Sequence, residues 1–246
     1  MQQYSADLHV HTVLSPCGDF EMSPVNIVET AARKKIDILG ITDHNSTKHG
    51  ALIQKMAEKM GIFVLCGAEV TTKEEIHCLT FFDNLNTLKM FQQYLDQHII
   101  KVQNKPDLFG YQVVVDENEM ILEEVNHLLI NAINQSIDEV EKKVHNLGGL
   151  FIPAHIERPA YSLFSQLGFV PPGLKADALE VSKTQSLEDF KQKHPELSEY
   201  TMIQSSDAHY RDQIGTCTTQ FILKTRNFDE IRMALMNENG RRVEKY

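Results

Sequence analysis

Two histidines separated by one residue, His9 and His11, lie near the start of the chain in the motif D-L-H-V-H-T. The apolar run Ala6–Val10 that contains this motif predicts a strand, and on a strand residues i and i+2 face the same side. Both imidazoles could therefore reach one metal ion. A lone H-x-H motif is weak support, because paired core or surface histidines are more common than paired ligands.

Further donors follow at the ends of other apolar runs, in the motifs I-T-D-H-N, C-G-A-E-V, E-I-H-C, I-P-A-H and S-S-D-A-H, and one carboxylate lies in the loop after His11. With His9 and His11, the candidate metal ligands are therefore Asp19, His44, Glu69, His77, His155, Asp207 and His209. The carboxyl ends of parallel strands converge on one mouth, where active sites form. We therefore predict that these residues meet at a metal centre.

The number and type of these donors indicate more than one ion. A catalytic zinc ion takes about three protein ligands and leaves one position for water. Six imidazoles and three carboxylates, with Glu69 as a bridge, could serve two or three divalent ions. Such a donor set suits zinc, manganese or iron better than magnesium or calcium. The bound ions would make the pocket positive and attract a phosphorylated substrate.

The elements that must position these donors alternate between apolar runs and amphipathic stretches, which predicts an α/β fold with a parallel sheet, open or closed into a barrel. We expect strands at Ala6–Val10, Ile36–Thr42, Ile62–Val70, Cys78–Phe82, Leu150–Pro153, Ala178–Val181, Thr201–Gln204 and Gln220–Leu223. Ser23 before Pro24, Thr47, and Asn227 before Phe228 are expected helix starts.

The segment 83–146 interrupts this rhythm. Within it, Asp116–Asn146 predicts mostly helix, with an apolar stripe that includes Ile121, Val125 and Leu129. This helix could be an ordinary packed one or an insertion that caps the site. No linker or internal repeat is visible, so residues 1–246 are expected to form one domain.

Composition narrows the class of protein. A hydrophobic content of 42% supports a sizeable core, and 24 Lys and Arg against 34 Asp and Glu give a net charge of −10, which argues against a nucleic-acid coat protein or a membrane-surface binder. No signal peptide or apolar stretch of membrane length is visible. The four cysteines form no C-x-x-C pair, which predicts reduced thiols and a cytoplasmic location; they are Cys17, Cys66, Cys78 and Cys217.

In this order, D-L-H-V-H-T, I-T-D-H-N, A-E-V, P-A-H and S-S-D-A-H resemble the motifs of the PHP (polymerase and histidinol phosphatase) superfamily, from about residue 5 to residue 215. The resemblance implies a distorted (β/α)7 barrel with a di- or trinuclear centre at its C-terminal mouth. It implies one ion held by His9, His11, Glu69 and Asp207, a second by Glu69, His77 and His155, and a third by Asp19, His44 and His209.

T-D-H-N, Asp19 and S-D-A-H resemble the small stand-alone phosphoesterases of this superfamily more than the histidinol phosphatases. One departure follows His155, where the chain reads I-E-R-P-A-Y. The nucleotide-bisphosphate phosphatases of the group usually carry Pro directly after this His. This departure weakens any transfer of their substrate to this chain.

We expect metal-dependent hydrolysis of a phosphomonoester in a small molecule, such as a nucleotide or sugar phosphate, with His209 or Asp207 handling a proton. Arg158, Arg211 and Lys183 are candidate phosphate contacts, although each could be a solvated loop charge. The alternatives are a phosphodiesterase or nuclease on the same centre, and a non-catalytic metal-binding regulatory module. Neither a membrane nor nucleic acid is an expected partner, and the oligomeric state is left open.

Two more carboxylates, Asp7 and Asp43, lie within two residues of a candidate ligand histidine. They could accept the second N–H of those imidazoles and fix the tautomer, or they could be buried strand-end residues without this role. The other histidines are expected to be packed or at the surface; they are His49, His98, His127, His145 and His194.

Overall fold

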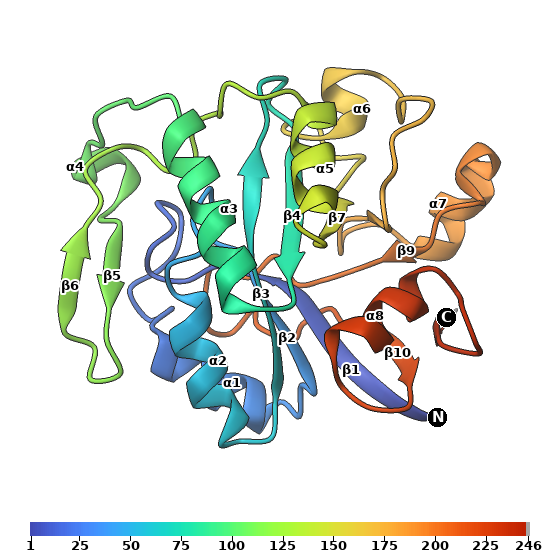
Figure 1. The fold of residues 1–246 in the computed structure, drawn as a ribbon, viewed down its shortest axis with the longest axis horizontal. Coiled ribbons are helices and arrows are strands. Elements are labelled where there is room, and N and C mark those ends of the chain that lie inside the picture. Colours follow the sequence, from blue (N-terminus) through green and yellow to red (C-terminus); the bar gives the residue numbers. More distant parts are fainter. Residues whose placement is uncertain (245–246) are drawn as a thin grey trace.

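The computed structural model describes residues 1–244 as a curled, mixed sheet flanked by helices (Figure 1). Its strand order is β11-β10-β1-β2-β3-β4-β7. The strands are β1 Gln2–Val10, β2 Ile38–Ile41, β3 Phe63–Thr71, β4 His77–Phe82, β7 Leu150–Pro153, β10 Thr219–Leu223 and β11 Arg242–Val243. A parallel pair, β8 Leu179–Glu180 and β9 Met202–Ile203, follows β7, and a bridge between Ala208 and Val10 joins the segment after β9 to β1. The sheet therefore curls toward the predicted barrel.

All eight predicted strands are present, but the sheet is not all parallel. β4 runs antiparallel to both β3 and β7. His77, the first residue of β4, consequently pairs with Thr71 at the carboxyl end of β3. The reversal thus places a residue from the start of a strand at the mouth where the other strands end.

The helices are α1 Pro24–Arg33, α2 Gly50–Glu58, α3 Leu85–His98, α4 Pro106–Phe109, α5 Ile137–Asn146, α6 Leu163–Gln166, α7 Leu187–Lys193, α8 Phe228–Leu235 and a 3-10 turn at Pro195–Leu197. Ser23 and Asn227 cap α1 and α8 through their side chains, as predicted. Thr47 does not cap α2, because its N–H and its hydroxyl both bond to Gln92. Within residues 1–244, no helix is long and apolar enough to cross a membrane.

The prediction of a mostly helical Asp116–Asn146 is wrong. A hairpin of β5 Val113–Val115 and β6 Ile121–Glu124 occupies its start and stands at one side of the molecule (Figure 1), and helix returns only at α5. The side chain of Asp116 accepts hydrogen bonds from the backbone N–H groups of Asn118 and Met120, both at 2.9 Å. This local capping of the backbone favours a turn over a helix.

On the inner face of the curled sheet, the side chains change from apolar to polar along the strands. Alternate residues of its strands, such as Leu65 and Leu79, form one buried apolar cluster with Ala178, which precedes β8, and α8 covers this cluster. Because side chains alternate between faces along a strand, Glu69 lies on the face of Leu65, and His77 lies on the face of Leu79. The inner face is therefore apolar below and polar at the mouth.

Candidate metal centre

Glu69, at the end of β3, is the centre of the polar cluster. It is 1% exposed, and its two carboxylate oxygens face imidazole nitrogens from five histidines. The shortest distances are 3.3 Å for His9, 3.4 Å for His11, 3.1 Å for His44, 3.0 Å for His77 and 3.2 Å for His155. Burial alone would raise the pKa of Glu69, but His77, His9 and His44 hold it well below its ordinary value. Glu69 is therefore an anion at neutral pH.

Four of the predicted donors converge on one point. His9 Nε2 lies 3.1 Å from His11 Nε2 and 3.3 Å from both Glu69 Oε1 and Asp207 Oδ1. His11 Nε2 lies 3.4 Å from Glu69 Oε2 and from Asp207 Oδ1. Bonds of about 2.0–2.1 Å to a tetrahedral ion place its ligands about 3.3 Å apart. The spacing therefore fits the ligand set that the sequence motifs implied for one ion.

The protonation of the two rings also fits a cation. His9 Nδ1 lies 3.0 Å from Glu180, which must accept its proton. His11 Nδ1 lies 3.0 Å from Ser15 Oγ, and because that hydroxyl donates to Asp43 it accepts from His11. In neutral rings both Nε2 atoms therefore present lone pairs to each other and to the carboxylates. Burial lowers the pKa of His9, but Glu180, Glu69 and Asp207 raise it well above its ordinary value. The same field that favours a proton favours a metal ion.

Unpartnered nitrogens add to this fit. His44 Nδ1, His77 Nε2 and His155 Nδ1 are buried and have no hydrogen-bond partner. Buried polar atoms are normally satisfied, so such a concentration is typical of a site that binds something else. The described chain contains three groups of residues whose donor atoms, within each group, lie within 4.8 Å of one another. These groups are His9–His11–Glu69, His44–Glu69–His77 and His11–Cys17–His44–His209. The donors present fit two or three divalent ions.

Asp19 is a predicted ligand whose side chain is turned into its own loop. His155 and Asp207 also lie outside these three groups, but they contact Glu69 and His9. The side chain of Asp19 accepts a hydrogen bond from the backbone N–H of Glu21 at 2.8 Å, within its own loop. It belongs to none of the donor groups formed by residues 1–244, where Cys17 lies instead. The motif could not show this, because the turn of the loop decides which of the two side chains faces inward.

Glu180 is a buried residue of the cluster that the sequence analysis did not single out. It ends β8, is 2% exposed, and accepts from His9 Nδ1 and from the backbone N–H of His155 at 3.1 Å. Asp7, one candidate for this role, instead accepts from the backbone of Ser206 and Gly215. Asp43 reaches His11 only through Ser15. The sequence signal for Glu180 was a carboxylate at the end of a predicted strand.

We expect Glu180→Gln to weaken metal binding and hydrolysis roughly 10–100-fold, because a neutral amide accepts the proton of His9 Nδ1 more weakly than a carboxylate does and lowers the basicity of the ring. Metal titration of the purified variant, together with kcat, measures the effect. Asp177→Asn is the matched control, since Asp177 accepts from His145 and Phe151 outside the centre. A lower melting temperature with unchanged metal affinity would show that Glu180 is merely structural.

The candidate catalytic residue His209 lies in the wall of the centre. Its ring stacks on His11, with centroids 4.2 Å apart, and its Nδ1 lies 3.1 Å from the backbone oxygen of Asp207. Burial, with a contribution from His11, lowers the pKa of His209 to about 4. The imidazole is therefore neutral at physiological pH, which suits a metal ligand or a proton acceptor.

The three candidate phosphate contacts have different surroundings. Arg158 Nη2 lies 2.6 Å from Asp207 Oδ2, the carboxylate oxygen other than the one near His9 and His11. Lys183 donates to the backbone oxygen of Ser206, next to Asp207. Arg211 instead donates to Thr30 on α1 at 3.0 Å and pairs with another α1 residue. Arg158 and Lys183 therefore remain candidates, and Arg211 is engaged elsewhere.

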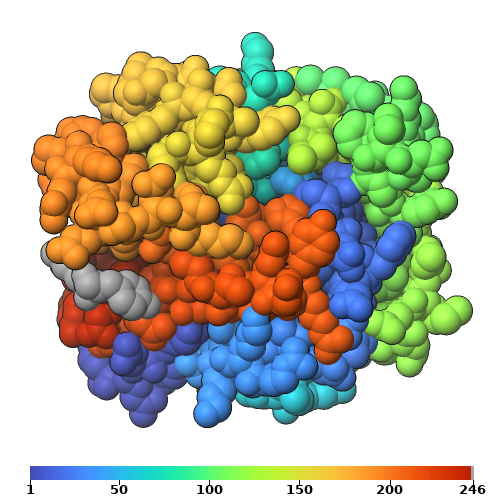
Figure 2. Space-filling model, turned by 180° about the vertical axis from the view of Figure 1, so that it is seen from behind, coloured from blue at the N-terminus to red at the C-terminus, as the bar shows by residue number. Residues whose placement is uncertain are grey.

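Backbone conformation at the mouth is unusual. Asn45, His155 and Asp207 have positive φ angles of 45°, 32° and 46°, in the left-handed region. Such conformations are disfavoured for residues other than glycine and cluster at functional sites. The loop after β1 (blue in Figure 2) and the segment after β9 (red-orange) lie side by side here, joined by hydrogen bonds from His11 N to Ala208 O and from Asp19 N to His209 O.

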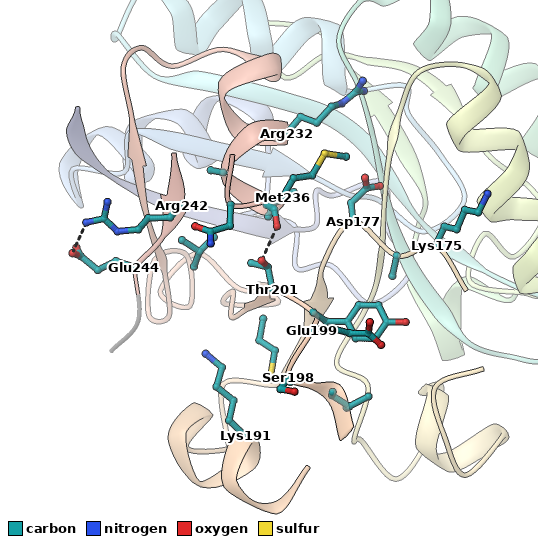
Figure 3. Close-up of a pocket in the computed structure, with 18 of the residues that line it drawn as sticks. Lys175, Asp177, Lys191, Ser198, Glu199, Thr201, Arg232, Met236, Arg242 and Glu244 are labelled. Atoms are coloured by element: carbon teal, nitrogen blue, oxygen red, sulfur yellow. Dashed lines mark hydrogen bonds and ion pairs between the residues drawn. The ribbon is translucent and has the colours of Figure 1, made fainter. Parts of the chain in front are cut away.

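A cleft of about 1280 Å³ is lined by residues from other parts of the chain (Figure 3). Asp177 and Thr201, at the amino ends of β8 and β9, line it together with Lys175, Arg232 and Arg242. None of the candidate metal ligands lines this cleft. In barrels of this kind the amino ends of the strands serve stability, whereas chemistry occurs at the carboxyl ends. We therefore place the active site at the histidine cluster, not at the cleft.

The curled α/β sheet and the buried imidazole–carboxylate cluster at its mouth define a metal-dependent hydrolase. More specifically, the PHP domain family model matches residues 7–238, and the chain belongs to this family. The predicted fold class and family resemblance are thereby confirmed. The family match therefore does not support the alternative of a non-catalytic metal-binding regulatory module.

Two relatives of the chain are known only as uncharacterized proteins. The chain is 24% identical to the uncharacterized protein YqxK of Bacillus subtilis over 99% of its own length and 64% of that protein. It is 36% identical to the uncharacterized protein MJ1587 of Methanocaldococcus jannaschii over only 28% of its length.

Among solved structures, the lesion-specific endonuclease PfuEndoQ of Pyrococcus furiosus matches with a TM-score of 0.73 and 20% identity, over 98% of this chain and 58% of that one. An endonuclease Q complex holds a 27-mer duplex with an abasic lesion. A proposed metal-dependent phosphoesterase of Bifidobacterium adolescentis matches with a TM-score of 0.58 and 20% identity, over 95% and 96% of the two chains. The chain thus spans less than two thirds of YqxK and of PfuEndoQ.

Proposed function

We propose that the protein hydrolyses a phosphomonoester in a small molecule, of the nucleotide or sugar phosphate class. The observation that carries the proposal is the single carboxylate of Glu69 surrounded by five imidazoles, with the guanidinium of Arg158 beside Asp207. Two or three divalent ions bound there would supply an acidified water and neutralise phosphoryl charge. Zinc, manganese and iron are the ions that this donor set suits.

The chain's own residues then have distinct tasks. His9 and His11 hold their Nε2 atoms 3.1 Å apart and 3.3–3.4 Å from the carboxylates of Glu69 and Asp207, so that little reorganisation is needed during the reaction. Arg158 can grip a phosphate oxygen with its planar fork. Neutral His209 or the carboxylate of Asp207 can accept a proton at the mouth.

We expect Arg158→Ala to raise KM roughly tenfold or more with little change in kcat, because a charge-assisted hydrogen bond contributes about 1.5–3 kcal/mol and acts on ground and transition state alike. Arg158→Lys should restore part of the loss, since an ammonium lacks the planar fork. Arg211→Ala is the matched control because Arg211 bonds to Thr30. Steady-state kinetics on the best substrate give the answer, and an unchanged kcat/KM would show that Arg158 pairs with Asp207 without contacting the substrate.

Hydrolysis of a phosphodiester in nucleic acid is a second candidate, and it weakens our expectation that nucleic acid is not a partner. The likeness to endonuclease Q covers nearly the whole chain. In addition, exposed aromatic side chains adjoin the candidate ligands: Phe20 is 67% exposed, Tyr210 is 53% exposed, and Tyr161 stacks on His77 with centroids 4.8 Å apart. Aromatic platforms beside a phosphate site can stack on bases. The net charge of −10 counts against a long nucleic-acid ligand.

A direct comparison of ester types tests the proposal. The metal-loaded protein should release phosphate from p-nitrophenyl phosphate and from members of a nucleotide and sugar phosphate panel. Bis(p-nitrophenyl) phosphate and an abasic DNA duplex should react more slowly. Faster cleavage of the diester and the duplex would favour the second candidate. No turnover of either ester type by metal-loaded protein would overturn both.

We further propose that residues 1–246 act as one domain in a reducing, cytoplasmic setting. The donors come from segments between His9 and His209, so the centre needs nearly the whole chain. All four cysteines are free thiols, which supports the second part.

A further inference from the structure

The third donor group contains a thiol where the family motif led us to expect a carboxylate. The donor atoms of His11, Cys17, His44 and His209 lie within 4.8 Å of one another. His11 already contributes its Nε2 to the four-donor group, and its Nδ1 is engaged by Ser15. The thiol of Cys17 and the imidazole of His209 belong to no other donor group, and His44, which also belongs to the group of Glu69 and His77, completes the set.

The loop after β1 fixes the orientation of Cys17. Its turn is closed by hydrogen bonds from Ser15 N to Thr12 O and from Gly18 N to Ser15 O, at 3.1 and 2.9 Å. A Cβ atom on Gly18 would lie 2.3 Å from Thr12 O, so this position must be glycine. Because the backbone is pinned on both sides of Cys17, its side chain direction is a property of the fold.

A second observation points to a ligand at this place. His44 is 2% exposed, and its Nδ1 lies 3.1 Å from Glu69 Oε2 without forming a hydrogen bond. Its ring is also crowded by His11, with centroids 4.6 Å apart, and faces His209 at 6.3 Å. A buried imidazole with an unpartnered nitrogen, set among other imidazoles and a thiol, is typical of a metal ligand.

We propose that Cys17, with His44 and His209, binds one ion of the centre as a thiolate ligand. Binding would release the thiol proton to solvent, so that a neutral Cys17 and a divalent ion give a sulfur–metal bond and one proton. Three protein ligands leave a position for water. Thiolate selects zinc, cobalt or iron over manganese and magnesium. The inference deepens the proposed function by naming the ligand set and the class of ion for this site.

Cobalt substitution reads this bond directly and does not depend on turnover. Protein loaded with Co²⁺ should show a sulfur-to-cobalt charge-transfer band in the near ultraviolet. The band should be lost in Cys17→Ala, together with one metal equivalent, and kept in Cys217→Ser and Asp19→Asn. Cys217 is the matched control because it lies outside every donor group of the described chain. Circular dichroism confirms that each variant is folded.

Alkylation of the wild-type protein provides a measurement that needs no variant. Cys17 is exposed, but burial of its thiol, with Glu69 and Asp207, raises its pKa; iodoacetamide at alkaline pH should therefore label it in metal-free protein, and Zn²⁺ should protect it. A missing band, or labelling that Zn²⁺ does not slow, overturns the thiolate assignment. Loss of one equivalent in Asp19→Asn alone would return the site to Asp19. Either result is independent of whether the loaded protein hydrolyses a monoester, which tests the proposed function separately.

Discussion

Replacing Glu69 by Gln should lower kcat/KM roughly 10³-fold or more and remove at least one metal equivalent per chain, since no other carboxylate can take its bridging place. Both of its oxygens are in use: Oε1 faces His77 and His155, and Oε2 faces His11 and His44. An amide offers one acceptor oxygen instead of two and carries no negative charge. Elemental analysis beside steady-state kinetics measures both losses.

Glu230→Gln is the matched control for this variant. Glu230 is another buried, ionised glutamate, and it pairs with Arg241 at 2.6 Å. The side-chain hydrogen bond from Arg241 lowers the pKa of Glu230, so its replacement should reduce thermal stability. Metal content and kcat should stay at wild-type values. If Glu69→Gln behaves like Glu230→Gln and keeps its metal, Glu69 is not the bridge.

Removal of the metal is the second change with a large expected effect. Chelation should abolish hydrolysis, and it should lower the melting temperature by roughly 5–10 °C relative to protein with free ion about 100-fold above its Kd. Without a metal ion, the two buried carboxylates of Glu69 and Asp207 lie 3.3–3.4 Å from His9 and His11 and lose the cation that would offset their charge. Differential scanning calorimetry and an activity assay, before and after chelation, measure the two effects.

Adding back single metals completes that experiment. Zn²⁺, Mn²⁺ or Fe²⁺ should restore both activity and melting temperature, and Mg²⁺ should restore less, because imidazole-rich sites bind it weakly. His145→Gln serves as a control histidine, since His145 pairs with Glu141 and Asp177 outside the centre. This variant should respond to chelation as the wild type does. A chelated protein with full activity would contradict a metal-dependent reaction.

The sequence predicted most of what positions the centre. Buried runs such as Ile62–Val70 and Leu150–Pro153 are bounded by turn signals, so their strands could be placed within a few residues. Donors at their ends could be located for the same reason. The direction of β4 was available too. The connection from Thr71 to His77 is far shorter than the dozen residues that a parallel crossover requires.

What the sequence could not give depends on contacts between distant segments. Glu180 reaches His9 across 171 residues, and no spacing rule links the two. Arg211 lies two residues beyond His209, yet its guanidinium turns to Thr30. In the insertion, Ile121 and Val125 share the spacing of a helix face, but Ile121 is 64% exposed on a hairpin. The side chain of Asp116 accepts a backbone hydrogen bond from Met120 and stabilises a turn, so a hairpin forms where the apolar spacing predicted a helix.

Asn45, His155 and Asp207 have left-handed backbone, which lowers the stability of the fold, whereas the side chains of His155 and Asp207 are needed as donors at the mouth. Glycine would adopt these φ angles without strain, which is of order 1–3 kcal/mol per residue for other side chains. Evolution for heat resistance alone would therefore favour glycine at His155 and Asp207 and would erase the donors in doing so. A stabilised variant of this protein should accordingly be sought by mutating the helices and the outer loops, with these three positions held fixed.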